Sequence, residues 1–464
     1  EGAASQNSAV PSENARLGIL AGQPVLTGPC PHPATQTNLA PGRATTCVDN
    51  MIASKYLALF QHPNGPVNPN DPNVANFVFA PTRVVHENFL TTRLDHKISD
   101  TNSLFGTYNY DDSPFSTPHG FNTTSVRSEV KRNIVALEWN HVFSPAFVNT
   151  ARLGYNRNFT TNNLLTGAIQ PAFADPSLGM MPGYDTPGIL ASGLSRTAGG
   201  LPGGFTFFRW NSYQFYDDAF LTRGTHSLKF GFAGENMRYN PWTLYLPTGL
   251  LRFIAKPNPN SGDPCSPAIQ CLLLNHPNSL EGGLPPTFPR GYRSTLVGGY
   301  IQDDWHVRHN LTLNMGLRYE MNTVISERQG KLTSLRNITD PLPTCGTSAP
   351  SATNVVLGKP GCAGVAPIFS NPTLRNFEPR FGFAWDPSGN GKTAVRGGFA
   401  IFDVLPLPGY FFSQAWAPFF LTGTVVDSPA SPLSGTLGIP PTAAGSAYSN
   451  FFSQTPKPGC TSPL

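Results

Sequence analysis

The stretch Gly298-Gly-Tyr-Ile-Gln-Asp-Asp-Trp-His-Val-Arg-His-Asn-Leu-Thr-Leu-Asn-Met-Gly-Leu-Arg-Tyr-Glu-Met-Asn322 decides the fold. From Leu311 to Met321 every second residue is apolar, and the residues between are polar or glycine. This period of two predicts a long β-strand with one apolar face. A second extended segment ends at Trp305, a short turn earlier, so the two segments form an antiparallel hairpin.

The length of the strand indicates its surroundings. Strands of soluble domains usually stop near five or six residues, whereas a tilted strand needs roughly 9 to 11 residues to cross a bilayer. The alternation after Leu311 lasts long enough for such a crossing. The hairpin therefore favours an all-β, membrane-spanning protein.

Two motifs carry a family resemblance. Tyr300-Ile-Gln-Asp-Asp-Trp305, followed by Asn310-Leu-Thr-Leu-Asn-Met-Gly-Leu-Arg-Tyr-Glu320, resembles the barrel of Oar-like TonB-dependent outer-membrane receptors. The likeness extends over about residues 45–405. It implies a plugged barrel in the bacterial outer membrane that imports an unidentified ligand with energy relayed through the TonB complex. Such barrels have about 22 strands, and the sequence shows neither a plug nor a TonB-contacting segment.

Four further strand pairs share the design of the first hairpin. Each pair has a short turn rich in Gly, Pro, Asn, Asp or Ser. The pairs are 89–98 with 104–112, 130–142 with 147–159, 207–221 with 227–239, and 377–385 with 393–402. The connections between pairs are long: 112–129, 160–206, 240–290, 323–376, and from 403 onward. Short turns at one rim and long loops at the other are typical of a transmembrane meander barrel.

The strand count and the side-chain pattern lead to two structural expectations. Ten strands cannot close a barrel of the family's size, so we expect segments 89–98 and 393–402 not to pair with each other. Outward-facing residues should be apolar and inward-facing residues polar, with Leu313, Leu317, Phe381 and Phe383 pointing to lipid. Asp303 shares the lipid-facing phase, which a bulge or a position near the headgroups would relieve.

The sequence divides into three predicted regions. Residues 1–85 form a loop-rich extracellular segment, 86–405 the barrel with its loops, and 406–464 an extracellular loop and the start of further barrel. Residues 50–60 fit a short helix whose apolar face carries Ile52, Tyr56, Leu57 and Phe60. A disordered linker remains an alternative for residues 1–25.

The seven cysteines indicate an oxidising compartment. Three close pairs lie in Pro- and Gly-rich segments and predict three loop disulfides, Cys30–Cys47, Cys265–Cys271 and Cys345–Cys362. Cys460 has no obvious mate, which suggests a partner beyond Leu464. The spacings do not favour a zinc site.

Composition excludes several classes of protein. Charged residues make up 12% and the net charge is +4, with no Lys/Arg run, so no nucleic-acid partner is expected.

The chain begins without a visible signal peptide, which indicates processing or a fragment. The long uncharged run from Val404 to Val426 contains prolines and cannot form a regular spanning helix.

The sequence contains few candidate catalytic, cofactor-binding or metal-binding residues. No motif of an enzyme, cofactor site or metal site is recognisable. The acidic pairs Asp111–Asp112, Asp217–Asp218 and Asp303–Asp304 point to opposite strand faces, so a lumen charge network with Arg318, Arg380 and Arg396 is favoured over acid/base or calcium chemistry. Several tryptophans could form a sugar-stacking surface, but an interfacial girdle is favoured. The predicted interfacial aromatics are Trp139, Trp305, Tyr319 and Trp385.

Two alternatives stay open. A passive porin or structural outer-membrane protein would share the strands without a plug. A secreted β-rich adhesion or carbohydrate-binding protein would bury Leu313 and Phe383 between two packed sheets.

Overall fold

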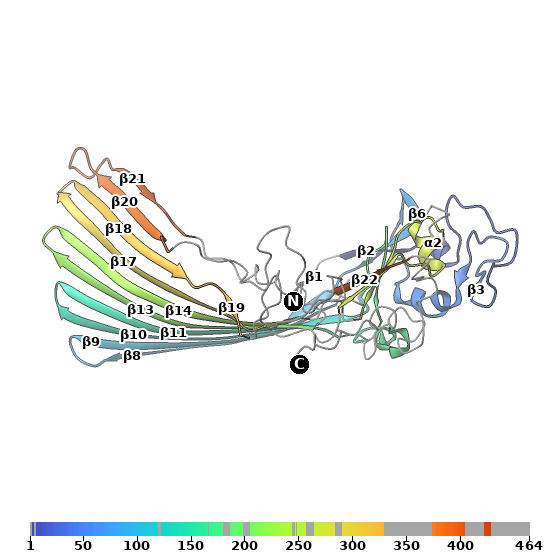
Figure 1. Ribbon diagram of the computed structural model, residues 1–464, viewed down its shortest axis with the longest axis horizontal. Coiled ribbons are helices and arrows are strands. Elements are labelled where there is room, and N and C mark those ends of the chain that lie inside the picture. Colours follow the sequence, from blue (N-terminus) through green and yellow to red (C-terminus); the bar gives the residue numbers. More distant parts are fainter. Residues whose placement is uncertain are drawn as a thin grey trace, which may run out of the picture.

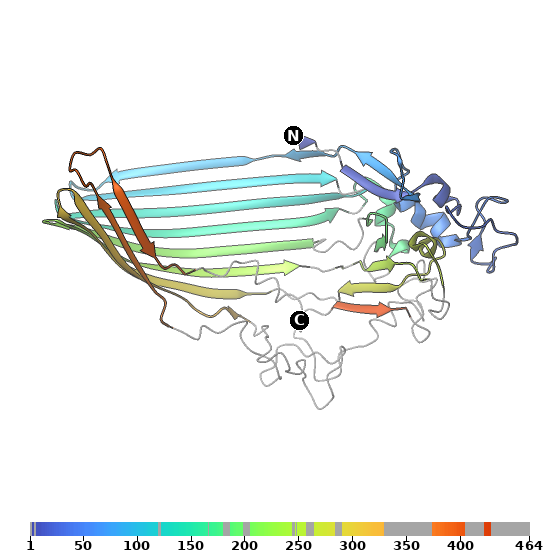
Figure 2. The same cartoon turned by 90° about the horizontal axis from the view of Figure 1, so that it is seen from above.

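One large antiparallel sheet dominates the computed structural model (Figures 1 and 2). The structure describes residues 2–3, 6–118, 122–165, 167–179, 186–197, 205–243, 246, 248–256, 264–283, 290–328, 374–403 and 422–427. The sheet has 13 strands in the order β1-β7-β9-β10-β11-β13-β14-β17-β18-β20-β21, while β8 pairs with β9 and β19 pairs with β17. The strands are β1 (Gly2–Ala3), β7 (Thr82–Val85), β8 (Asn88–Lys97), β9 (Asn102–Pro118), β10 (Ser125–Ser144), β11 (Phe147–Leu165), β13 (Phe205–Arg223), β14 (His226–Thr243), β17 (Tyr292–Arg308), β18 (Leu311–Asn322), β19 (Ser326–Glu327), β20 (Phe377–Trp385) and β21 (Val395–Ala400).

All five predicted hairpins are present, with their short turns together at one end of the sheet (Figure 1). Local hydrogen bonds and the backbone conformation of glycine stabilise these turns. In the turn after β20, the Asp386 carboxylate accepts hydrogen bonds from the backbone N–H groups of Ser388, Gly389 and Gly391. In the β13–β14 turn, Gly224 adopts a φ of +59°, a left-handed conformation that favours glycine.

The strands are longer at the loop end than the sequence predicted. The expected loop 112–129 is wrong, because β9 extends to Pro118 and β10 begins at Ser125. β10 has 20 residues. At about 3.3 Å per residue such a strand is roughly 65 Å long, well beyond the ~25 Å apolar band of a membrane barrel.

The two faces of the sheet differ as predicted. The outer face carries large, exposed apolar side chains, and the inner face carries polar and more crowded side chains. Outer-face examples are Leu137, Leu153, Phe215, Phe232, Ile301, Leu317 and Phe381. Leu313 and Phe383 are partly exposed and no second sheet covers them in the described part of the chain. This contradicts the soluble-sandwich alternative.

The apolar outer surface covers only the half of the sheet nearest the turns. Farther along the same strands the outer face becomes polar and basic. Its residues there include Lys131, Asn133, Arg157, Arg209, Asn211, Arg238, Asn240 and Arg293, together with the aromatic Phe159, Phe207 and Trp242. A lipid bilayer therefore fits the turn-side half, and the loop-side half extends into water.

The two edges of the sheet do not meet. Within the ranges that the structure covers, β8 pairs with β9, β21 pairs with β20, and no ladder joins β8 to β21. This agrees with the expectation that segments 89–98 and 393–402 do not close a ten-stranded barrel.

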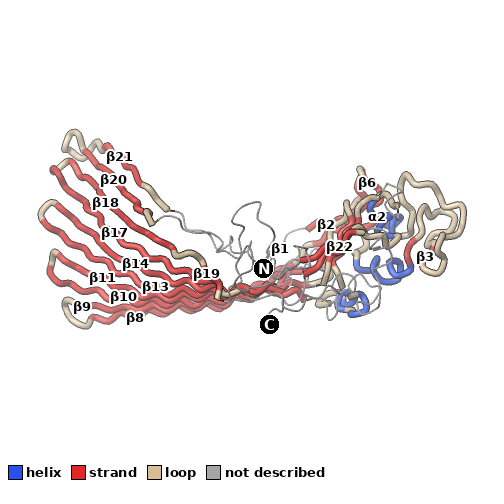
Figure 3. The backbone as a smooth tube through the Cα atoms, viewed as in Figure 1, coloured by secondary structure: helices blue, strands red, loops and turns tan. Residues whose placement is uncertain are grey.

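Beyond the loop end of the sheet lies a compact region, here called the loop unit, with three small sheets and all the helices among the described residues (Figure 3). Its segments fall within residues 6–79, 171–197, 250–283 and 422–427. Its strands are β2 (Gln6–Pro11), β3 (Gln36–Thr37), β4 (Val48–Asp49), β5 (Val67–Asn68), β6 (Asp71–Phe79), β12 (Gly188–Ala191), β15 (Leu250–Phe253), β16 (Ser279–Gly283) and β22 (Thr422–Val426). Its helices are α1 (Glu13–Arg16), η1 (Ile52–Tyr56), η2 (Leu57–Leu59), η3 (Pro171–Ala174), η4 (Pro176–Leu178) and α2 (Ala268–Leu273).

A hydrophobic core holds the loop unit together. The predicted helical face is confirmed in burial, with Ile52, Tyr56, Leu57 and Phe60 all at 6% exposure or less. Its backbone differs from a regular α-helix, because η1 is a π-helix and η2 a 3₁₀-helix. Residues 6–25 are ordered through most of their length, with β2 and α1 contributing Val10 and Ala15 to this core.

Two of the three predicted disulfides are present, and both lie in the loop unit. Cys30–Cys47 has a Cα–Cα distance of 5.9 Å and Cys265–Cys271 one of 5.2 Å. Cys345, Cys362 and Cys460 lie outside the described residues.

Charged groups inside the loop unit are held by specific partners. The Asp49 carboxylate accepts hydrogen bonds from the backbone N–H groups of Met51 at 2.9 Å and Ile52 at 3.2 Å. Burial raises the pKa of Asp49, and these hydrogen bonds oppose the shift. The buried Lys256 ammonium lies 2.7 Å from the Asp427 carboxylate and so ties the segment after β15 to the segment after β22.

Candidate functional site

A charge network lies on the inner face of the sheet, centred on Arg152 of β11. Its guanidinium donates to Glu138 on β10 at 2.7 Å and to Asp218 on β13 at 2.5 Å. Glu138 and Arg152 are register partners, so their side chains project from the same face. Tyr300 on β17 completes the network by donating its hydroxyl to Asp218 at 2.7 Å.

A glycine makes this last contact possible. β14 lies between β13 and β17, and its Gly231 pairs with both Asp218 and Tyr300. A Cβ atom at Gly231 would lie 2.6 Å from the Asp218 Oδ1 atom and 2.8 Å from Tyr300 Cε1. The missing side chain therefore lets the Tyr300 ring cross over β14.

Similar pairs extend over the inner face. Arg318 pairs with Glu320 at 3.1 Å, and Arg380 with Glu378 at 3.3 Å. Glu235 accepts from the hydroxyl of Ser212 at 2.5 Å. The two arginine–glutamate pairs are neutral overall, and together with Glu235 they leave a polar surface on which water can lie.

The predicted acidic pairs divide between the faces. Asp218 and Asp304 lie on the inner face, where Asp304 accepts from Asn314 at 2.6 Å. Asp217 and Asp303 lie on the outer face. Of the predicted network, Arg318 and Arg380 bond to glutamates rather than to these aspartates, and Arg396 forms no ion pair among the described residues. Arg152, Glu138 and Tyr300 were not predicted as members of the network.

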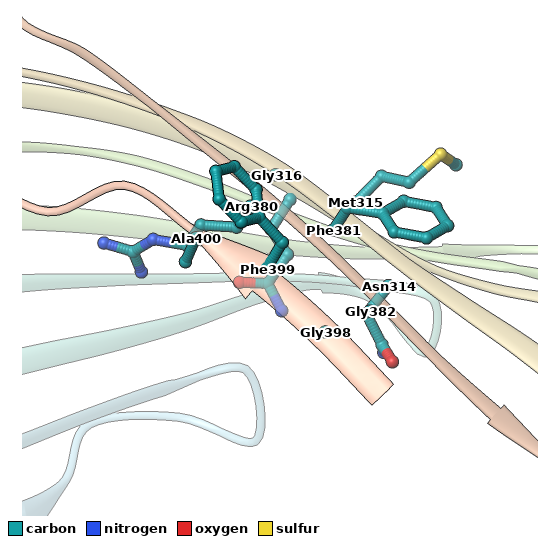
Figure 4. Close-up of a pocket in the computed structure, with 10 residues that line it drawn as sticks. Asn314, Met315, Gly316, Arg380, Phe381, Gly382, Gly398, Phe399 and Ala400 are labelled. Carbon is teal, nitrogen blue, oxygen red and sulfur yellow. The ribbon is translucent and has the colours of Figure 1, made fainter. Parts of the chain in front are cut away.

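Two hollows lie along the sheet. One, of about 380 Å³, is bounded on the inner face by the aromatic side chains of Phe208, Trp210 and Tyr239 and by Asn156, Asn158 and Thr160. Trp210 therefore faces inward rather than toward lipid. The other, of about 360 Å³, lies where glycines of β18, β20 and β21 leave space beside Asn314 and Arg380 (Figure 4).

In the ranges that the structure describes, no group of three His, Cys, Asp or Glu side chains could hold a metal ion. No helix among the described residues is long and apolar enough to cross a membrane.

The predicted interfacial aromatics all lie on the outer face. Trp139, Trp305 and Trp385 are near the turns, whereas Tyr319 lies farther along β18, where its ring is 5.1 Å from that of Phe377. The His226 ring stacks on Trp305 at 5.3 Å. An interfacial role for the four residues stays a prediction.

Asp303 keeps its outer-face position, since the only irregularity in the β17–β18 ladder falls between His306 and Arg308. Its carboxylate lies 2.7 Å from Nδ1 of His226, and His226 is the register partner of Trp305. A histidine partner close to the turns explains how an acidic group is tolerated on this face.

A second set of outer-face aromatics marks the loop-side limit of the apolar surface. Tyr108, Tyr155 and Tyr213 occupy one register row across β9, β11 and β13. The Tyr155 and Tyr213 rings lie 5.2 Å apart. These tyrosines were not among the predicted interfacial aromatics.

On β17 the distance from Trp305 to the tyrosine row matches a membrane, whereas Trp139 on β10 lies only four residues from that row. The tyrosine row continues to Thr295 on β17, ten residues from Trp305. At about 3.3 Å per residue and a tilt of about 40°, ten residues span roughly 25 Å along the membrane normal, the height of the apolar band of outer-membrane barrels.

Two outer-membrane transporters are similar to parts of this chain. Among solved structures, the chain is similar to the outer membrane transporter YddB from Escherichia coli, with 11% identity and a TM-score of 0.38, over 72% of this chain and 33% of the transporter. It is also similar to the ferric citrate transporter FecA in its unliganded form, with 9% identity and a TM-score of 0.22, over 67% of this chain and 47% of FecA. The chain thus spans between a third and a half of the length of these structures.

A search of curated proteins finds no match to this sequence. The outer membrane beta barrel domain family matches residues 1–461. Since this match extends over nearly the whole sequence, the chain belongs to the outer membrane beta barrel domain family.

Proposed function

We propose that this outer-membrane barrel works as a TonB-dependent receptor that imports a ligand across the outer membrane. The observation that carries the proposal is the inner face, where paired charges such as Arg152 and Asp218 line a polar surface at the depth of the bilayer. A sheet with lipid on one side and fixed polar groups on the other provides a hydrated route through the membrane.

The coupling to TonB rests on the resemblance of Tyr300–Trp305 and Asn310–Glu320 to Oar-like receptors. We propose the same orientation as in those receptors, with the turns in the periplasm and the loop unit outside the cell. In this arrangement residues 1–85 and 406–464 are mainly extracellular and residues 86–405 contain the barrel strands. The loop unit then meets the ligand first.

The test uses the full-length protein, purified in detergent and reconstituted in vesicles. A receptor should bind the periplasmic domain of TonB and should not release a small dye trapped in the vesicles. Dye leakage without TonB binding would establish the passive porin alternative. Release from cells without detergent, as for a secreted adhesion protein, would refute both membrane functions.

A further inference from the structure

Arginines gather in one register row on the outer face of the sheet. The row crosses five neighbouring strands and consists of Asn133, Arg157, Asn211, Arg238 and Arg293. We call it the arginine row. Arg209 lies one step farther toward the loops on the same face. Arg157, Arg209 and Arg238 are exposed, and Arg293 is partly exposed.

The arginine row lies at the edge of the apolar band. Directly on its turn side is the row that contains Tyr108, Tyr155 and Tyr213. Two of these tyrosines point their hydroxyls toward the arginine row, since Tyr108 donates to Asn133 at 2.8 Å and Tyr155 to Asn211 at 3.0 Å. Tyrosines with an apolar body and a hydrated tip are typical of the headgroup level of a membrane. The arginines therefore lie among the headgroups.

These arginines form no ion pair with a carboxylate among the described residues, although the charge of Glu327 acts on Arg293 from a longer distance. The acidic groups on the outer face of β9 and β10, Asp112 and Glu129, both lie beside Lys131, at 4.0 and 2.8 Å. Arg238 and Arg293 are instead direct register partners on adjacent strands. Like charges placed opposite each other destabilise a sheet, and an anion held between them removes this repulsion.

Neutral contacts hold the guanidinium groups in place. Arg238 lies over the Tyr213 ring at 4.8 Å and donates from Nε to Asn236 at 2.9 Å. Arg293 donates from Nη1 to Asn240 at 3.0 Å. Each guanidinium has further N–H groups for an anion, and its fork matches the oxygens of a phosphate.

We propose that the arginine row binds the phosphate groups of an anionic lipid headgroup in the leaflet on the loop side. A headgroup phosphate is the anion that this depth in a membrane supplies, and clustered basic residues at that depth recognise such lipids. The neighbouring Asn133 and Asn211 add amide groups for the sugar or glycerol part of the headgroup. The proposal holds for a receptor and for a porin alike.

The experiment measures binding of lipid A to the full-length protein in a neutral detergent. Wild-type protein is compared with the double variant Arg157→Gln/Arg238→Gln. Arg223→Gln is the control, because Arg223 is an exposed arginine at the turn end of the same β13–β14 hairpin. The double variant should bind lipid A more weakly by about fivefold for each arginine removed. The control should bind like wild type.

Three further measurements separate the possible ligands. Lipid A stripped of its phosphates should bind wild type and double variant equally, and added salt should weaken only the binding of intact lipid A. Inorganic phosphate that binds as tightly as lipid A would show a site for the free ion, and tight binding of an acidic peptide alone would show a protein partner. Either result, or equal binding of lipid A to wild type and double variant, would overturn the proposal. The salt series on wild type decides the case if the double variant does not fold.

Discussion

Replacing Phe232 by arginine tests the placement of the bilayer. Phe232 lies on the outer face of β14 with 50% of its surface exposed, six residues from His226 at the turn end and four from Asn236 in the tyrosine row. At about 2.5 Å of depth per residue along a tilted strand, it lies close to the middle of the apolar band. An arginine there should cost about 2–4 kcal/mol of folding free energy relative to Phe232→Ala. Both variants are made together with Asp217→Asn, because Asp217 is the register partner of Phe232 and would otherwise form an ion pair with the arginine. The folding equilibrium should therefore shift by roughly thirty- to seven-hundred-fold.

The assay is urea titration of the full-length protein in lipid vesicles, with the folded fraction measured by its faster migration on a gel of unheated samples. Asn236→Arg is the matched control, because it places the same charge on the same strand and face at the membrane edge. There the cost should be about 0–1 kcal/mol. Equal costs at the two positions would refute the location of the lipid band.

Three other changes test separate parts of the structure. Reducing Cys30–Cys47, which spans 17 residues, should destabilise the loop unit by about 3 kcal/mol; protease cleavage should then increase in the loop unit while the strands stay protected, and unchanged cleavage would count against the cross-link. Gly231→Ala should break the hydrogen bond of Tyr300, because its methyl group would occupy the path of the ring; a crystal structure of the variant with that bond intact would contradict this account. Asp49→Asn should stabilise the loop unit at neutral pH, since a pKa raised by burial means that ionisation costs stability, and the gain should vanish below the ordinary pKa of 3.8. Hydrogen exchange of the loop unit at pH 3 and pH 7 measures this difference, and equal gains at both values would contradict it.

The sequence predicted β13 over nearly its whole length, but it ended β9, β10 and β11 five or six residues early on the loop side. The period-two signal needs an apolar face, and the outer face is apolar only in the turn-side half. The predicted strands end at Asp112 and begin again at Val130, near the place where the outer face becomes polar, although the ladder continues to Pro118 and from Ser125. A strand in water on both faces has no hydrophobic alternation to detect.

The inner face shows a second limit of prediction from the sequence. That neighbouring aspartates point to opposite faces followed from the strand period alone. The link from Tyr300 to Asp218 did not, because it joins residues 82 positions apart across an intervening strand. It depends on the register of three strands and on the glycine at position 231, and no local pattern specifies that register.

The loop unit also has a consequence for the order of assembly. Its segments are remote in the chain: the backbone N–H of Ala9 donates to Ser195, 186 residues away, and β16 pairs with β22. Bringing such distant segments together in a free chain would carry a large loop-closure entropy and a slow search. Once the strands of the hairpins have paired, the ends of these strands hold the segments of the loop unit close to each other. The sheet then acts as a template, and the loop unit forms as the late, rapid step of folding.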